Sequence, residues 1–115
     1  MLEIGFVASL SLAALGPPEP RRAADPHAQC GYHHRVSIDE ARGARDHETV
    51  SDHLARLNRL AGALATRTGV SRDGAHAILR RTGARVRSAR GDGLVSVAEA
   101  REACAALESS LFPSG

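Results

Sequence analysis

Apolar residues recur at steps of three or four positions through the middle of the chain. The series consists of Val50, Leu54, Leu57, Ala61 and Leu64. This spacing places the apolar side chains on one face of an α-helix and the intervening polar residues on the other. We therefore predict an amphipathic helix from about residue 47 to residue 68, either unbroken or interrupted near Gly62.

Two capping boxes mark further helix starts. Each has a serine followed three residues later by a glutamate, a spacing that lets each side chain bond a free backbone amide at the helix start. The box at residues 37–40 predicts a short helix over residues 38–45. The box at residues 96–99 predicts a final helix that ends before Pro113. The apolar stripe expected to be buried on this helix is Val97, Ala100, Cys104, Leu107 and Leu111.

Small and apolar residues between these helices follow a second pattern. Ala65 is small enough for two helices to cross closely, and Gly69 favours a turn with positive φ. Val70 fills the gap between the helices, while Ala75 and Ile78 give the second helix a buried face. The segment resembles the helix-turn-helix of bacterial repressors and related regulators. This resemblance implies an all-α domain that binds double-stranded DNA. The alternative is a plain αα-hairpin, in which the turn at Gly69 and Val70 only makes a corner, and an unbroken first helix would favour it.

The motif covers residues 61–79. Its second helix begins after Ser71, whose hydroxyl suits an N-cap. It is predicted to end near Thr82, because Gly83 is a typical C-terminal stop. Alternating residues and turn-forming glycines over 84–95 then favour a short β-hairpin, as in the wing of winged helix-turn-helix proteins. The expected fold class is an all-α small helical bundle with a helix-turn-helix core, to which this wing is an optional addition.

Prolines interrupt regular structure near the N-terminus, at Pro17, Pro18 and Pro20. We predict irregular backbone over residues 16–34, a flexible N-terminal segment and Pro-rich linker over residues 1–35, and the helix-turn-helix domain over residues 36–112. Residues 2–15 are largely apolar. We predict that they form an N-terminal segment without a targeting role, and a secretory signal peptide is the alternative. They are too short to span a bilayer as a helix, so no membrane partner is expected.

The basic residues are unevenly distributed along the chain. Residues 56–90 hold nine arginines and one acidic residue, whereas residues 1–55 and 91–115 each have a net charge of −3. A segment with a net charge of +8 attracts phosphate backbones through counterion release, unless its arginines pair with the acidic flanks. Because the basic segment coincides with the motif, we favour DNA as its partner.

In the helix-turn-helix geometry the second helix lies in the major groove. The resemblance therefore implies contacts to base edges from Ser71, Arg72 and His76. Phosphate contacts are expected from Arg80, Arg81, Arg85, Arg87 and Arg90.

The function expected from this resemblance is sequence-specific binding of double-stranded DNA by a small bacterial or phage-type transcriptional regulator. We expect a homodimer, because one short recognition helix provides limited affinity. We also expect the protein to be located in the cytoplasm. The alternative is a helical protein-interaction module, antitoxin-like or an adaptor, whose Arg-rich face binds an acidic protein. Such a module would need an apolar anchor, for which Leu60 and Phe112 are the candidates.

The cysteines and histidines raise the question of a metal site. Cys30 and His33, followed by His47 and His53, have nearly the spacing of a zinc finger, but the first pair lacks its second cysteine. We therefore predict no metal ligand. We expect Cys30 and Cys104 to be reduced, and a disulfide in an oxidising compartment is the alternative. With no nucleophile motif and no phosphate-binding loop, neither a catalytic residue nor a cofactor is expected, and the chain is not predicted to be an enzyme.

Overall fold

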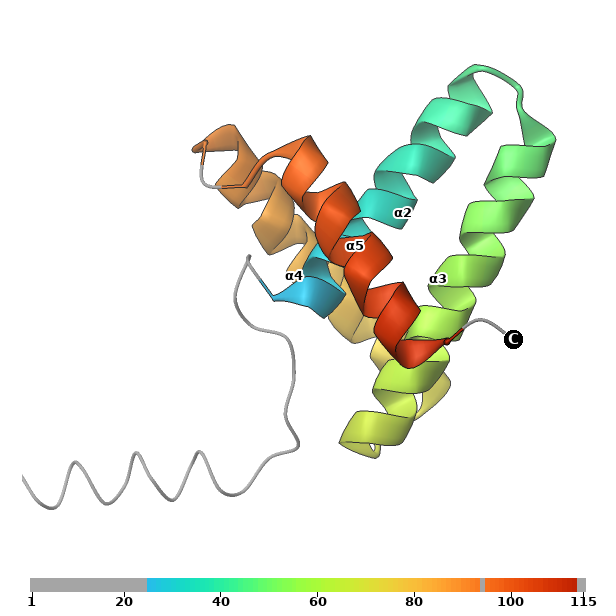
Figure 1. Cartoon of the computed structure of the whole chain (residues 1–115), viewed down its shortest axis with the longest axis vertical. Coiled ribbons are helices and arrows are strands. Elements are labelled where there is room, and N and C mark those ends of the chain that lie inside the picture. Colours follow the sequence, from blue (N-terminus) through green and yellow to red (C-terminus); the bar gives the residue numbers. More distant parts are fainter. Residues whose placement is uncertain (1–24, 94, 114–115) are drawn as a thin grey trace, which may run out of the picture.

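The structure is a computed structural model that describes residues 25–93 and 95–113 (Figure 1). This part of the chain holds four helices and no strand, so the all-α prediction is confirmed. The helices are α2 (Pro26–Gly43), α3 (His47–Thr68), α4 (Arg72–Gly91) and α5 (Val97–Leu111). Helix α2 packs against each of the other three, and α3 also packs against α4. The arrangement of α3, α4 and α5 therefore depends on α2.

Helix α2 begins twelve residues before the helix start predicted at residue 38. The Asp25 carboxylate caps it by accepting a hydrogen bond from the His27 amide at 2.8 Å, and Pro26 occupies the first turn, where a missing N–H costs nothing. The prediction of irregular backbone is therefore wrong from residue 26 onward, because α2 already begins there. Residues 1–24, which include the predicted Pro-rich linker, lie outside the described residues.

The first predicted capping box is also wrong. Ser37 lies in the interior of α2, where its hydroxyl donates to the carbonyl of His33 at 2.9 Å instead of capping a helix start. The second box is confirmed, with both reciprocal bonds between Ser96 and Glu99 present at the start of α5. Of the stripe predicted on α5, Ala100 and Cys104 are buried and Val97 is exposed.

Helices α3 and α4 meet at the predicted turn. Helix α3 is unbroken, and Gly69 ends it with φ of 78° while its amide donates to the carbonyl of Ala65 at 2.8 Å. Ser71 caps α4, because its hydroxyl accepts a hydrogen bond from the Gly74 amide at 3.0 Å. An unbroken α3 of 22 residues is longer than the first helix of a typical helix-turn-helix.

The predicted end of α4 at Gly83 and the β-hairpin over residues 84–95 are wrong. Helix α4 continues through Gly83 to Gly91. Val86 and Ala89, in this extension, are buried in one apolar cluster with Tyr32 of α2. Tertiary packing against α2 therefore outweighs the helix-breaking tendency of a single glycine.

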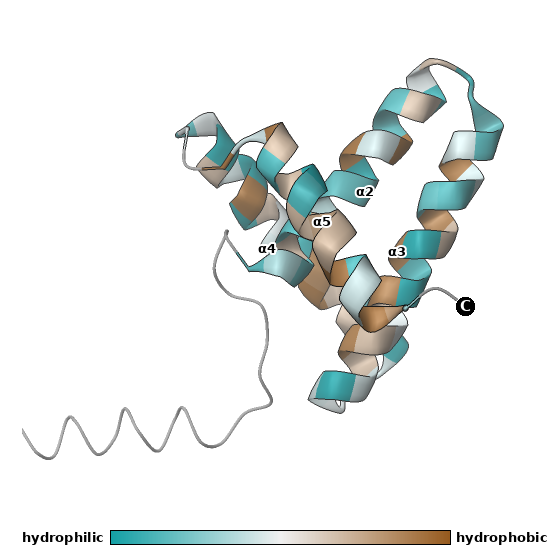
Figure 2. Ribbon diagram, viewed as in Figure 1, coloured by the Kyte–Doolittle hydropathy of each residue, from teal (hydrophilic) through white to brown (hydrophobic). Residues whose placement is uncertain are grey.

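The other apolar cluster lies where α2, α3, α4 and α5 meet. Its largest wholly buried side chains are Leu60, Leu64 and Leu79. Polar and apolar residues alternate around the helices, as expected for amphipathic helices packed in a bundle (Figure 2). Because Leu60 has no exposed surface, it is excluded as an anchor for a protein partner. Within residues 25–93 and 95–113, no helix combines the length and apolar character needed to cross a membrane.

Substitutions at two glycines test these assignments. Gly83→Ala is expected to raise the free energy of unfolding by about 0.5–1 kcal/mol, because alanine favours a helix interior. An added Cβ there meets no atom within 4 Å. Gly69→Ala is expected to lower the free energy of unfolding by about 1 kcal/mol, since φ of 78° disfavours any side chain. Urea unfolding followed by circular dichroism measures both effects, and a change of the same sign in the two variants would contradict the assigned helix ends.

Candidate functional site

Four arginines line a cleft among α2, α3 and α4, which we call the basic cleft. Arg35 and Arg42 come from α2, and Arg80 and Arg87 come from α4. Each pair is seven residues apart, which is two helical turns, so both members lie on the same side of their helix. The cleft consists of two hollows, of about 290 and 200 Å³, and both are lined by Arg35 and Arg87.

Arg35 is half-buried, whereas the other three arginines of the basic cleft are exposed. Its Nε is buried and has no hydrogen-bond partner within the described part of the chain. Burial lowers the pKa of Arg35 and the nearby charge of Arg80 lowers it further, while the carboxylate of Asp39 has the opposite effect. The arginine remains charged at neutral pH. An anion bound in the basic cleft would relieve the repulsion between Arg35 and Arg80.

The predicted base-contacting residues at the start of α4 are engaged with α3 or with the helix cap. The Arg72 guanidinium lies over Gly62, where an added Cβ would be 3.1 Å from its Nη2. His76 Nε2 lies 3.2 Å from Oδ1 of Asn58. The pKa of His76 is lowered, mainly by burial and then by the charges of Arg35 and Arg80. The hydroxyl of Ser71 is used in capping α4.

The predicted phosphate-contacting residues do not form one set. Arg80 and Arg87 belong to the basic cleft, whereas Arg90 donates from Nη1 to the Tyr32 hydroxyl at 3.2 Å. Arg81 and Arg85 lie on a different side of α4, because each successive residue is rotated by about 100° around a helix. Sequence reasoning missed Arg35 and Arg42. Their seven-residue spacing was visible, but the helix that gives this spacing its meaning was not predicted.

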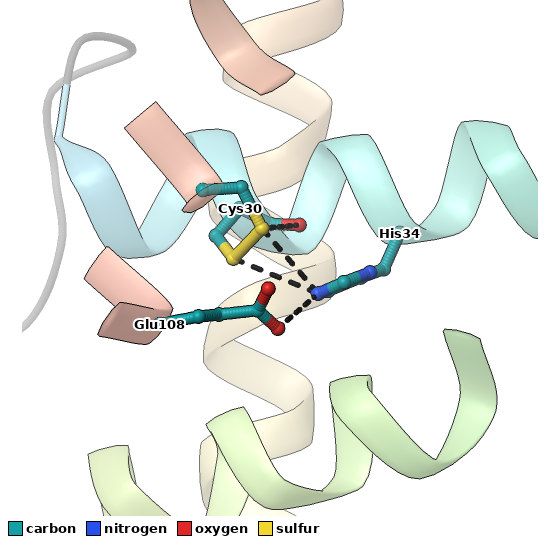
Figure 3. A group of neighbouring side chains, drawn as sticks. Cys30, His34 and Glu108 are labelled. Atoms are coloured by element: carbon teal, nitrogen blue, oxygen red, sulfur yellow. Dashed lines mark hydrogen bonds and ion pairs between the residues drawn. A yellow bond between two sulfur atoms is a disulfide. The ribbon is translucent and has the colours of Figure 1, made fainter. Parts of the chain in front are cut away.

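A second group of side chains lies between α2 and α5 (Figure 3). Cys30 and His34 are four residues apart on α2, and Cys104 and Glu108 are four residues apart on α5. Cys30 and Cys104 form a disulfide, so the prediction of two reduced cysteines is wrong. His34 Nε2 lies 3.0 Å from Oε2 of Glu108, 3.4 Å from Sγ of Cys104 and 3.6 Å from Sγ of Cys30. We call these four residues the Cys–His–Glu cluster.

Arg56 of α3 holds the carboxylate of the Cys–His–Glu cluster with two hydrogen bonds. Its Nη2 donates to Oε1 of Glu108 at 2.5 Å and its Nε donates to Oε2 at 3.3 Å. Burial raises the pKa of Glu108, but the hydrogen bond from Arg56 and the charge interaction with His34 bring it below its usual range. Burial lowers the pKa of His34 to about 4, against the opposing effect of Glu108. At neutral pH the site therefore combines a neutral imidazole with an ionised carboxylate.

Two more histidines adjoin this cluster. His34 Nδ1 lies 2.9 Å from Nδ1 of His53 on α3, and the ring of His33 lies 5.6 Å from that of His53. The spacing of a zinc finger groups Cys30 with His33, His47 and His53. The structure instead brings together two four-residue spacings, Cys30 to His34 and Cys104 to Glu108, through the packing of α2 on α5.

Comparison with protein families, with characterised proteins and with solved structures finds no match for this chain. The basic cleft and the Cys–His–Glu cluster therefore provide the evidence on its function. The basic cleft offers cations to an anionic partner. The Cys–His–Glu cluster offers sulfur, nitrogen and oxygen atoms in a buried position.

Reduction of the disulfide is expected to lower the free energy of unfolding by about 2–5 kcal/mol, because the bond closes a long loop in the unfolded chain. Cys30 and Cys104 are 74 residues apart. Urea unfolding of the metal-free protein, with and without a dithiol, measures the difference. The double variant Cys30→Ser with Cys104→Ser serves as the control, since its stability should not respond to the dithiol. Identical unfolding of the oxidised and reduced protein would show that the bond does not constrain the unfolded chain.

Proposed function

We propose that the protein binds double-stranded DNA through the basic cleft and the adjoining start of α4. The observation that carries the proposal is the convergence of four arginines from two helices on the two adjoining hollows of the basic cleft, which together form one groove. Arginine binds phosphate oxygens in bidentate fashion, so a phosphate backbone is the polyanion that this groove suits.

The size of the basic surface also favours a nucleic acid over a small anion. Arg72 and Arg87 are fifteen residues apart on α4, which corresponds to about 22 Å along the helix axis. That length corresponds to about six base pairs along the axis of a duplex, at about 3.4 Å for each pair. Asp39 is the acidic residue that lines the cleft, and one carboxylate does not neutralise four arginines.

Sequence-specific recognition would come from the start of α4. Arg72 and His76 would exchange their contacts with Gly62 and Asn58 on α3 for base edges in the major groove. A homodimer would present two such helices to two half-sites, as expected of a small bacterial or phage-type transcriptional regulator. Sedimentation equilibrium with and without duplex measures whether the dimer forms.

An acidic protein partner is the second candidate. The first hollow of the basic cleft is lined by apolar Ile38, Leu54 and Leu57 as well as by arginines, and Leu54 is 44% exposed. A partner helix with acidic residues beside an apolar side chain would fit this combination. Phe112, the other proposed anchor, is half-buried with the guanidinium of Arg59 over its ring at 4.3 Å, which leaves less apolar surface to bind.

Fluorescence anisotropy with random-sequence duplex at several salt concentrations tests the DNA proposal. We expect micromolar affinity at low salt, falling steeply as salt rises. Arg80→Ala and Arg87→Ala should each weaken binding to all duplexes and reduce the salt slope by about 1, because each removes one phosphate contact. Arg101→Ala is the matched control, since it removes the same charge from an exposed site on α5.

An equal loss of affinity in Arg101→Ala would show that overall charge, and not the basic cleft, governs binding. Absence of binding at low salt would overturn the DNA proposal and favour the acidic protein partner. In that case Leu54→Ala should weaken the protein complex more than any single arginine substitution does.

Arg72→Ala tests base recognition separately, on a duplex selected from a random pool by the unmodified protein. We expect the preference for the selected duplex over a scrambled one to fall by about 1–3 kcal/mol, because a bidentate base contact is lost. Arg87→Ala, in the basic cleft, is expected to weaken both duplexes equally. Anisotropy titrations with both duplexes give the ratio, and an unchanged preference in Arg72→Ala would exclude α4 as the recognition helix.

A further inference from the structure

The Cys–His–Glu cluster is assembled from two four-residue spacings on packed helices. Residues four apart lie on the same face of a helix, so α2 presents Cys30 and His34 to α5, and α5 presents Cys104 and Glu108 to α2. One ligand atom from each residue lies within 4.8 Å of all the others. Figure 3 shows His34 and Glu108 directed toward the same point beside the two sulfur atoms.

We propose that the reduced chain binds one Zn²⁺ through Cys30, His34, Cys104 and Glu108, and that the disulfide and the bound ion are mutually exclusive states of this site. Two thiolates, an imidazole and a carboxylate are all established zinc ligands, and four of them complete a tetrahedral site. The inference is independent of DNA binding, since the basic cleft contributes none of these residues.

The distances around His34 support this assignment. Zinc bonds of about 2.0–2.3 Å to nitrogen, oxygen and sulfur place neighbouring ligand atoms about 3.3–3.8 Å apart in a tetrahedron. His34 Nε2 is 3.4 Å and 3.6 Å from the two sulfur atoms, which lies within this range. Its 3.0 Å distance to Oε2 of Glu108 is slightly shorter, so this carboxylate oxygen must move outward to bind the ion. The two sulfur atoms must separate, because they are bonded to each other in this structure.

The surroundings of the site are those of a closed metal centre. Cys30, His34 and Cys104 have no exposed surface. Nδ1 of His34 lies 2.9 Å from Nδ1 of His53, so the ring has an outer partner while Nε2 faces the sulfur atoms. Arg56 orients the Glu108 carboxylate. A zinc ion bound to two thiolates and one carboxylate forms a site with net negative charge, which the guanidinium of Arg56 balances.

The two states interconvert by thiol–disulfide exchange. A dithiol reductant supplies two electrons and two protons, so the bond between Cys30 and Cys104 opens to two thiols while the reductant becomes a disulfide. Zn²⁺ then displaces both thiol protons, which pass to solvent, and binds the thiolates. In both states a bond links α2 to α5, covalent in one and coordinate in the other.

The test measures zinc bound to the full chain after reduction and removal of the reductant under anaerobic conditions. We expect one zinc per chain by elemental analysis in the reduced protein and none in the oxidised protein. Titration with Co²⁺ should give the absorption of tetrahedral thiolate-bound cobalt only after reduction. Zinc bound equally by the oxidised protein, or no zinc bound by the reduced protein, would overturn the proposal.

Variants assign the ligands. Cys104→Ser should abolish tight binding, and Glu108→Gln should weaken it at least tenfold in competition with a chromogenic chelator. Glu102→Gln is the matched control, since it removes an exposed carboxylate from the same helix. His33→Gln should also have little effect. If Cys104→Ser does not fold, the cobalt spectrum of the reduced unmodified chain still reports thiolate ligands, and a spectrum without them would assign binding to His33, His34 and His53 and overturn the proposal.

Discussion

Burial of α2 is the interaction on which the rest of the structure depends. This helix packs against α3, α4 and α5, while its connection to α3 lies at the surface. Its neighbours place their apolar residues against it, and α4 extends to Gly91 because Val86 and Ala89 find apolar partners there. Both constellations also use this helix. His34 and Arg35 are adjacent in sequence, yet one belongs to the Cys–His–Glu cluster and the other to the basic cleft.

The sequence predicted those features that depend on local chemistry. Capping by Ser71 and Ser96, the positive φ of Gly69 and the amphipathic face of α3 each involve residues within one or two turns of one another. Such interactions leave a readable pattern, because the partner positions have fixed spacing. The all-α class followed from them. DNA binding and the contacts assigned to α4 rest on a resemblance and on charge, and they stay predictions.

The remaining features depend on contacts between distant residues. Helix α2 has a weak apolar periodicity, and His27, Gln29 and His34 are among its buried residues, so no pattern search singles it out. Because the sequence does not predict this helix, Arg35 could not be assigned to a helix face. The disulfide joins residues 74 positions apart, and nothing in the spacing of two cysteines indicates whether they meet. Neither the basic cleft nor the Cys–His–Glu cluster could be predicted from the sequence, because each forms only where two helices pack together.

The disulfide also changes what backbone cleavage does to this molecule. Because it joins the first described helix to the last, it encloses α3, α4 and both connections that flank α3. A protease that cuts the exposed connection at residues 44–46 leaves two polypeptides that are still covalently joined. The fragments then stay at high effective concentration and keep their packing, and they separate only when a reductant opens the bond. Whether the two fragments of a cleaved chain stay together thus depends on the redox state of this disulfide.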